Sequence, residues 1–318
     1  MFGSKTRQVV ETIKRIAYRH EISKGLMALS GGADSIATAF LIQKSGVKIS
    51  ALHCNFQLRG YESIRDRIFV EEFCNNYNIP LLIKDFDVFD YIEAHPGESI
   101  EMACRNLRYK WFFNQLSSTG ADRIITGHNA DDNIETFFIN MLRGCGTRGL
   151  KGMEMDSGVI WRPLLHIHKE DILEIIKENN LSYITDSTNL SSDYRRNYLR
   201  NEIIPALKDK WLGFNKAMDS TLNHIAEENK IIEDSLNKIL SETGYKLQVD
   251  TILNYPAPLL LIRRFIDRLK PFPSIAEEVL AAIKADKPHI RHWSLKLGKL
   301  ILRNKCLSIE MSHCESRT

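Results

Sequence analysis

Residues 25–42 of the chain read GLMALSGGADSIATAFLI, and two apolar runs here flank a polar, glycine-rich segment. The apolar run at residues 25–29 predicts a short buried strand, and the glycine-rich residues 30–35 predict a turn. The apolar residues 36–42 then predict a helix. A strand, a glycine loop and a helix in this order gather backbone N–H groups around one point, because the turn and the helix N-terminus meet there. The sequence therefore predicts an anion-binding loop.

Every residue of this loop is a candidate for binding nucleotide phosphates. The candidates are Ser30, Gly31, Gly32, Ala33, Asp34 and Ser35. The serine hydroxyls can donate hydrogen bonds to phosphate oxygens, and Asp34 supplies the carboxylate oxygen that Mg²⁺ prefers. The loop lacks the lysine of a Walker A motif; what it can hold is pyrophosphate, which indicates cleavage of ATP between its α and β phosphates. An ordinary capped helix start explains the loop alone equally well, since Ser, Asp and Gly are favoured there.

Strand and helix patterns alternate on both sides of the loop. Strands are expected at 47–54, 80–86, 122–126 and, from weaker signals, 159–161 and 182–185, and helices at 9–19, 62–76, 99–116, 131–142 and 169–178. This alternation predicts right-handed crossovers and a parallel sheet with helices on both faces, as in Rossmann-like α/β folds.

The pattern changes after about residue 201, where strand signals nearly disappear. A long charged helix is expected at 214–240, with shorter helices at 259–269 and 275–284. Residues 294–302 and 306–311 flank Arg303-Asn304-Lys305 and predict a terminal hairpin. We therefore expect an α/β domain over residues 1–210, followed by a smaller, mostly helical domain over residues 211–318.

The composition excludes several classes of protein. With 43% hydrophobic and 26% charged residues in 318, the chain is globular rather than disordered or collagenous. A net charge of +3 is too small to indicate a nucleic-acid partner, so only local clusters can do so. The six cysteines form no CxxC pair and have no zinc-site spacing, which indicates free thiols. No apolar run approaches 18 residues, so we expect a cytoplasmic protein without a membrane partner.

A second candidate site follows the expected strand at 122–126, in the segment GHNADDNIET at residues 127–136. On a helix, His128, Asp132 and Glu135 share one face, because they are spaced i, i+4 and i+7. The carboxyl edge of a parallel sheet is where open α/β folds bind ligands. The two acids can bind an ammonium group or Mg²⁺, and the spacing does not choose between them. A simpler alternative is that Asp131 and Asp132 only complement the helix dipole.

Two basic segments are candidates for binding a polyanion. Residues 143–152, RGCGTRGLKG, combine four glycines with Arg143, Arg148 and Lys151, so the backbone can approach a polyanion closely. Residues 194–200, YRRNYLR, contain Arg195, and they place Arg196 and Arg200 on one helical face beside tyrosines, which suits phosphate binding and base stacking. The alternatives are an exposed linker and a solvated basic helix.

Together these segments resemble the tRNA(Ile)-lysidine synthetase family of PP-loop ATP pyrophosphatases. The matching motifs are SGGxDS at 30–35, RxxRY at 105–109, HxxDDxxET at 128–136, RGxGxxGLxG at 143–152, RPLL at 162–165 and DxTN…YxRNxxR at 186–200. Their order and separation match over roughly residues 20–210. Cys104 replaces the usual alanine before Arg105, and Asn133 stands where glutamine is frequent. The chain has little room for the further C-terminal domain of many members, so it resembles the short form of the family.

The resemblance implies an adenine nucleotide alpha hydrolase-like fold and a two-step reaction. The wobble cytidine of a CAU-anticodon tRNA(Ile) is adenylated with ATP and Mg²⁺, and L-lysine then displaces AMP to give lysidine, which changes codon specificity from AUG to AUA. The implied catalytic residues are Asp34 as the Mg²⁺ ligand, Asp132, Glu135, Arg105 and Arg200, with His128 beside the nucleotide. Asp132 and Glu135 also bind the lysine substrate, and the implied tRNA contacts are Arg143, Arg148, Lys151, Arg195 and Arg196. A homodimer is compatible with the sequence, which leaves the oligomeric state open.

Three other functions fit these residues less well. A tRNA thiolase of the same superfamily typically uses cysteines in CxxC pairs, and none is present. An amide-forming PP-loop synthetase would not need the basic segments at 143–151 and 195–200. A tRNA-binding module without catalysis would tolerate loss of the acids, which are retained.

Overall fold

The computed structural model describes residues 3–185, 195–269, 274–285 and 290–312. The chain divides into two compact units, residues 1–226 and 227–318, with the division inside the long helix α11 (Phe214–Thr243). We expected the division before Phe214. The first half of α11 belongs to the N-terminal unit because Phe214, Met218 and Leu222 pack in a cluster with Ile134 and other apolar residues of that unit.

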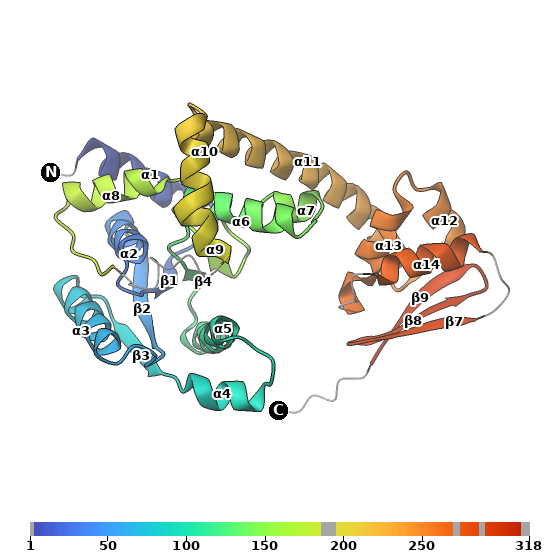
Figure 1. Cartoon of the computed structure of the whole chain (residues 1–318), viewed down its shortest axis with the longest axis horizontal. Coiled ribbons are helices and arrows are strands. Elements are labelled where there is room, and N and C mark those ends of the chain that lie inside the picture. Colours follow the sequence, from blue (N-terminus) through green and yellow to red (C-terminus); the bar gives the residue numbers. More distant parts are fainter. Residues whose placement is uncertain (1–2, 186–194, 270–273, 286–289, 313–318) are drawn as a thin grey trace. The chain divides into compact units, whose positions relative to one another are not determined.

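The N-terminal unit is built on a five-stranded parallel sheet (Figure 1). Its strand order is β3-β2-β1-β4-β5, and the strands are β1 (Lys24–Ala28), β2 (Lys48–Asn55), β3 (Leu81–Asp85), β4 (Arg123–Ile125) and β5 (Ile160–Trp161). All four neighbouring pairs are parallel, so the expected α/β sheet is confirmed. The strand order reverses between β1 and β4, and open α/β sheets bind ligands beside the carboxyl ends of two such strands.

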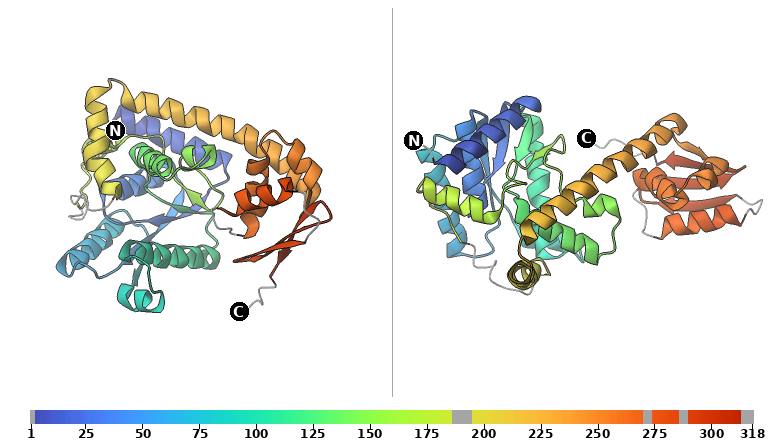
Figure 2. Two further views of the ribbon diagram at one scale, coloured as in Figure 1. Left: turned by 45° about the vertical axis from the view of Figure 1, so that its right-hand side comes forward. Right: turned by 90° about the horizontal axis from the view of Figure 1, so that it is seen from above.

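Helices cover both faces of this sheet, as Figures 1 and 2 show. One face carries α1 (Ser4–Arg19), α2 (Ala33–Ser45), α3 (Tyr61–Asn76) and α8 (Lys169–Glu178), and the other carries α5 (Ile100–Thr119) with the short α4 (Val88–Ala94). The helix α2 is buried on nearly all sides, with Ile36, Leu41 and Ile42 fully inaccessible. A helix that is apolar all round must be covered by other elements, and α2 is packed against α1 and α8.

Three local features of this unit were not expected. The helix α4 was not predicted, and one helical turn, α7 (Thr147–Leu150), lies inside the glycine-rich segment that was expected to be a loop. At 182–185, where a weak signal predicted a strand, the structure has only an isolated β-bridge between Gly32 and Ile184.

The C-terminal unit combines helices with an antiparallel sheet, which is more β-structure than the expected terminal hairpin. Beyond α11 its helices are α12 (Val249–Asn254), α13 (Pro258–Ile266), a 3₁₀ turn η3 (Asp267–Leu269) and α14 (Ile275–Lys284). Its sheet has the order β6-β9-β8-β7, with β6 (Lys246–Gln248), β7 (Arg291–Leu295), β8 (Gly298–Arg303) and β9 (Cys306–Met311). The hairpin around residues 303–305 is present, and Asn304 and Lys305 adopt the positive φ of 51° and 54° that its tight turn requires.

Candidate active site at the carboxyl edge of the sheet

The predicted anion-binding loop connects β1 to α2, as expected. Gly31 has a φ of +89°, and Gly32 is the N-cap of α2 with no side-chain cap. The loop is braced from behind, because Ile184 N donates to the Gly31 carbonyl at 2.9 Å and Ser35 Oγ donates to the Gly32 carbonyl at 2.9 Å. Ser30 Oγ lies 3.2 Å from Ser35 Oγ. The first turn of α2 thus presents backbone N–H groups that no side chain caps, which suits a phosphate group.

Gly127 allows the segment after β4 to lie directly against the start of α2. A Cβ atom at this position would come within 3.0 Å of the Asp34 carbonyl and of Ser35 N. Its absence lets Asn129 reach the loop, where Nδ2 of Asn129 donates to Asp34 Oδ1 at 3.1 Å. Asn129 also caps α6 (Ala130–Leu142), because its Oδ1 accepts from Asp132 N at 3.0 Å. Asn129 therefore connects the phosphate loop to the second candidate site.

Asp34 forms an ion pair that the sequence did not predict. Lys169 Nζ lies 2.7 Å from Asp34 Oδ1 and 2.8 Å from Oδ2, so the ammonium spans both oxygens. Lys169 is the first residue of α8. A cation in the first turn of a helix opposes the helix dipole, so this placement is a sequence signal that a specific partner holds the lysine.

Asp132 and Glu135 bind two arginines, and we call Asp132, Glu135, Arg196 and Arg200 the acid–arginine cluster. Arg196 Nε donates to Glu135 Oε2 and Arg200 Nε to Oε1, each at 2.6 Å. The Nη2 atoms of the two arginines lie 3.2 and 3.0 Å from Asp132 Oδ1. The side chain of Glu135 is 2% exposed, that of Asp132 14%. Asp132 and Glu135 share a face of α6 as expected, but the prediction was wrong for His128, which lies before the N-cap Asn129 and outside the helix. The acids are already paired with cations of the chain itself.

The arginines reach the acids from a helical segment with an unusual turn. Arg196 lies in α9 (Arg195–Tyr198) and Arg200 in the π-helical turn Leu199–Ile203, which α10 (Ile204–Lys210) follows. Pro205 lacks an N–H group and its ring would clash with a carbonyl one turn earlier, which explains why the helix widens there. Burial lowers the pKa of Arg200, but hydrogen bonds and charge from Glu135 and Asp132 outweigh it and raise the pKa.

His128 is neutral in this site. Burial lowers its pKa to about 4, against the opposing effect of Asp132, and the cations Arg162, Arg196 and Arg105 add to the depression. Its Nδ1 lies 2.8 Å from Thr126 Oγ1, which fixes the ring. A neutral imidazole can exchange hydrogen bonds with a ligand without a change of charge.

Arg105 comes from α5 on the other face of the sheet. Its guanidinium carbon lies 5.0 Å from the centre of the Tyr109 ring, which is a cation–π contact. Burial lowers the pKa of the neighbouring Arg162, whose Nε has no hydrogen-bond partner. A buried guanidinium N–H without a partner is costly, and an anionic ligand would satisfy it. Arg162 belongs to the RPLL motif, and only the resemblance drew attention to it.

Asp131 ties three elements together behind the site. Its Oδ2 accepts from Lys169 N at 2.8 Å, and its Oδ1 accepts from Lys208 Nζ at 2.7 Å. Burial opposes ionisation of Asp131, but contacts with His168, Lys208 and Lys169 N outweigh it and lower the pKa. His168 Nε2 lies 2.9 Å from Asp219 Oδ2 in α11, so α6, α8 and α11 meet at these groups.

His168 makes the stability of the N-terminal unit depend on pH. Asp131 and Asp219 raise the pKa of His168 from 6.5 to about 9. A raised pKa stabilises the fold fully below about pH 6.5, and that stabilisation is lost as the pH rises towards 9. We expect His168→Gln to lower the free energy of unfolding by about 1–3 kcal/mol at pH 6 and by little at pH 9. Urea denaturation at pH 6 and pH 9 measures the free energy of unfolding of both proteins. An equal loss of stability at the two pH values would contradict the prediction.

Of the other predicted tRNA contacts, Arg143 lies far along α6 from the acids. Arg143 follows the last residue of α6, so it is about 16 Å along the helix axis from Asp132. Arg148 is exposed, and Lys151 Nζ pairs with Glu154 at 2.5 Å. Arg195 is exposed at the start of α9. The motif residues 186–194 lie outside the described residues.

The donor set suits a magnesium ion that phosphates help to hold. Within residues 3–185, 195–269, 274–285 and 290–312 no group of three or more His, Cys, Asp or Glu side chains is arranged to hold a metal. Mg²⁺ is commonly bound by one or two carboxylates together with nucleotide phosphates, and Asp34 beside an open phosphate loop fits that pattern.

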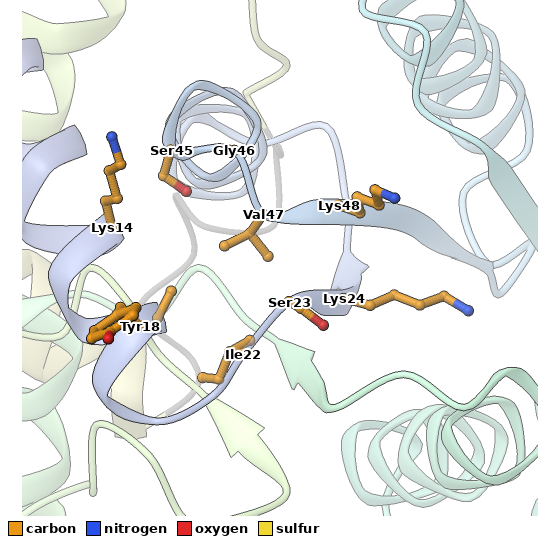
Figure 3. A pocket seen from close by; sticks show the side chains of 10 residues that line it. Lys14, Tyr18, Ile22, Ser23, Lys24, Ser45, Gly46, Val47 and Lys48 are labelled. Carbon is orange, nitrogen blue, oxygen red and sulfur yellow. The ribbon is translucent and has the colours of Figure 1, made fainter.

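A separate hollow of about 460 Å³ lies at the opposite edge of the sheet, at the amino ends of β1 and β2 (Figure 3). Its lining includes Lys14, Lys24 and Lys48, but Figure 3 shows Lys14 at one side of the hollow and Lys24 and Lys48 both extending toward the other side. Lys24 Nζ donates to the Thr119 carbonyl at 2.6 Å instead. The hollow therefore contains no converging set of cations.

Among the described residues, no helix combines the length and the apolar character that a membrane span requires.

Comparison with known proteins places the chain in a family. A family model for the PP-loop domain matches residues 5–207. The tRNA(Ile)-lysidine synthase of Bacteroides thetaiotaomicron is 39% identical over 239 residues, which cover 74% of this chain and 55% of that protein. The chain thus spans little more than half the length of this relative. The tRNA(Ile)-lysidine synthase of Chlorobaculum tepidum is 33% identical over 240 residues, which cover 71% of this chain and 72% of that protein.

A solved structure supports the same fold. The U34-tRNA thiolase NcsA from Methanococcus maripaludis superposes with a TM-score of 0.57 at 20% identity, covering 70% of this chain and 80% of that one. At this identity the likeness concerns the fold alone. With the PP-loop domain over residues 5–207 and a relative covered over 72% of its length, the chain belongs to the tRNA(Ile)-lysidine synthase family of PP-loop proteins.

Proposed function

We propose that the chain catalyses ATP-dependent formation of lysidine at the wobble cytidine of tRNA(Ile) with a CAU anticodon. One observation supports the proposal: Asn129 joins the loop at Asp34 to the acid–arginine cluster, so the groups that would bind the nucleotide adjoin those that would bind a charged amino acid. The family relatives named tRNA(Ile)-lysidine synthase support the same reaction. The cytoplasm, which contains tRNA, ATP and lysine, is the compartment that this reaction requires.

In the first step, the C2 oxygen of the cytidine attacks the α phosphorus of ATP, and the bond to pyrophosphate breaks. The loop at residues 30–35 binds the phosphates through N–H groups, and neutral His128 donates a hydrogen bond to the nucleotide. Mg²⁺, when bound at Asp34, neutralises charge on the phosphate oxygens. Arg105 and Arg200 stabilise the negative charge that develops on the leaving pyrophosphate.

In the second step, the side-chain amine of lysine attacks C2, and AMP leaves with the oxygen. Asp132 and Glu135 bind a lysine ammonium group, and Arg105 binds the lysine carboxylate. Asp132 is the more accessible acid, at 14% against 2%, so the ammonium enters by replacing an arginine hydrogen bond there while Glu135 keeps its arginines. The amine that reacts must lose its protons, which pass to solvent or AMP.

Cations outside the acid–arginine cluster bind the tRNA backbone in this proposal. They are Arg143, Arg148, Lys151 and Arg195, and Arg196 contributes from the cluster itself. Phosphate contacts do not distinguish one tRNA from another, because RNA sequence is read from unstacked loop bases. In this proposal the C-terminal unit supplies the further contacts that distinguish tRNAs.

Removal of one exposed cation tests the tRNA contacts. We expect Arg148→Ala to weaken cognate and non-cognate tRNA alike by up to about tenfold, because a phosphate contact carries no sequence information. The slope of log affinity against log salt should fall by roughly one unit or slightly less. Filter binding across a salt series measures both, with Lys5→Ala as a control, since Lys5 pairs with Asp171 on α8. An unchanged slope would remove Arg148 from the interface.

Mass spectrometry of nucleosides tests the reaction itself. tRNA(Ile) transcript treated with the protein, ATP and lysine should yield lysidine, and omission of ATP or lysine should abolish it. Methionine tRNA, which has the same anticodon, should remain unmodified. Failure to form lysidine, or formation of a thionucleoside when a sulfur donor is added, would reject the proposal.

A further inference from the structure

The phosphate loop has no lysine of its own, but the fold brings one to it. In residues 30–35 the position of the Walker A lysine is not filled. Lys169 lies 135 residues after Asp34 in the chain, and its ammonium contacts both Asp34 oxygens, at 2.7 and 2.8 Å. The pair is partly open to solvent, with side-chain exposures of 37% for Lys169 and 32% for Asp34. A ligand can therefore reach both groups.

The backbone of Lys169 is fixed independently of its side chain. Its N–H group donates to Asp131 Oδ2 at 2.8 Å, which holds the start of α8. The buried residues Ile172 and Ile175 of α8 lie in the same core cluster as Ile36 of α2. The side chain can thus exchange partners while its attachment point stays next to the loop.

We propose that Lys169 binds a phosphate of Mg·ATP and is held on Asp34 while the site is empty. This inference rests on the proposed use of ATP. A carboxylate is the ligand that Mg²⁺ takes from this loop, so the metal competes with the ammonium for the same oxygens. The displaced ammonium then lies beside the phosphate oxygens of the nucleotide, the anions that lysine binds in other phosphate loops.

The alternative is that Lys169 only neutralises Asp34 and supports the fold. The two roles differ in their effect on nucleotide affinity. If Lys169 contacts a phosphate, its removal weakens binding of a triphosphate but not of adenosine. If it is only a counter-ion, its removal leaves triphosphate binding unchanged or improves it, because Asp34 becomes free for the metal.

The experiment compares Lys169→Met with Lys208→Met by isothermal titration calorimetry. Lys208 is a matched control, since its ammonium pairs with the neighbouring Asp131 at 2.7 Å but does not contact Asp34. The probes are Mg²⁺ with the non-cleavable α,β-methylene ATP, adenosine, and Mn²⁺ alone. For Lys169→Met we expect affinity for the triphosphate to fall by about tenfold to a hundredfold, unchanged adenosine binding, and tighter Mn²⁺ binding. Lys208→Met should match the wild type with all three.

Unchanged or tighter triphosphate binding by Lys169→Met would overturn the proposal. If methionine prevents folding, Lys169→Gln gives the same comparison, because it retains a donor without the charge. Failure of the wild-type protein to bind the triphosphate would instead reject the proposed function, so the two failures are distinguishable. Circular dichroism melting of each variant separates loss of fold from loss of binding.

Discussion

Replacing Asp34 by alanine is expected to lower pyrophosphate release from ATP by at least about a thousandfold. The substitution removes the carboxylate that would hold Mg²⁺, and it leaves the Lys169 ammonium beside the loop without its partner. The fold should survive, because partly exposed ion pairs contribute only about 0–1 kcal/mol. A coupled pyrophosphate assay with saturating tRNA measures the rate, and thermal melting checks the fold.

Asp171→Ala is the matched control for Asp34→Ala. It removes the same charge from the neighbouring helix α8, where Asp171 pairs with Lys5 away from the loop. We expect its rate of pyrophosphate release to stay within about twofold of the wild type. Retained activity in Asp34→Ala, or production of ADP without AMP by the wild type, would contradict the role of the loop in α,β cleavage.

The parallel sheet could be predicted because its signals are local. Residues 25–29 form an apolar run that ends in a glycine turn, and β1 is found at Lys24–Ala28 with α2 directly after the turn. The limits of α8 and α14 also match the expected ones, since apolar residues recur at helical spacing throughout both. The C-terminal sheet was harder to predict from the sequence. The residues of β7 and β8 resemble one apolar segment, because the turn signal before Gly298 is weak.

The candidate site was predictable only in part, because its contacts are between distant residues. The shared face of Asp132 and Glu135 follows from helical spacing and is present. Their pairing with Arg196 and Arg200 joins residues more than 60 positions apart, which no local pattern records. The same holds for Lys169, whose only local signal is an unfavourable charge at a helix start.

Replacing Glu135 by glutamine is expected to impair lysine transfer far more than adenylation. The acid–arginine cluster has two negative and two positive groups, so its net charge is zero, and Glu135→Gln leaves it at +1. That charge repels the ammonium of lysine but not anionic ATP. We expect transfer to fall by at least about a hundredfold and adenylation by about tenfold or less.

The same substitution should also lower stability, which supplies a second measurement. Glutamine cannot accept from both arginine Nε atoms as a carboxylate does, and its amide NH₂ would face a guanidinium donor. We expect the free energy of unfolding to fall by about 1–3 kcal/mol in urea denaturation. Glu154→Gln, which removes an exposed acid paired with Lys151, is the control and should change neither quantity much.

The two half-reactions can be separated by isolating the adenylated tRNA and then adding lysine. For Glu135→Gln, the lysine concentration that gives half the maximal transfer rate should rise, because the ammonium is bound more weakly. The yield of adenylated tRNA should stay near that of the wild type. A higher concentration of lysine should restore part of the transfer rate, because the variant loses lysine binding. Equal loss in both half-reactions would assign Glu135 to ATP activation instead, since a residue that mainly holds lysine affects a step that precedes lysine binding much less than lysine transfer.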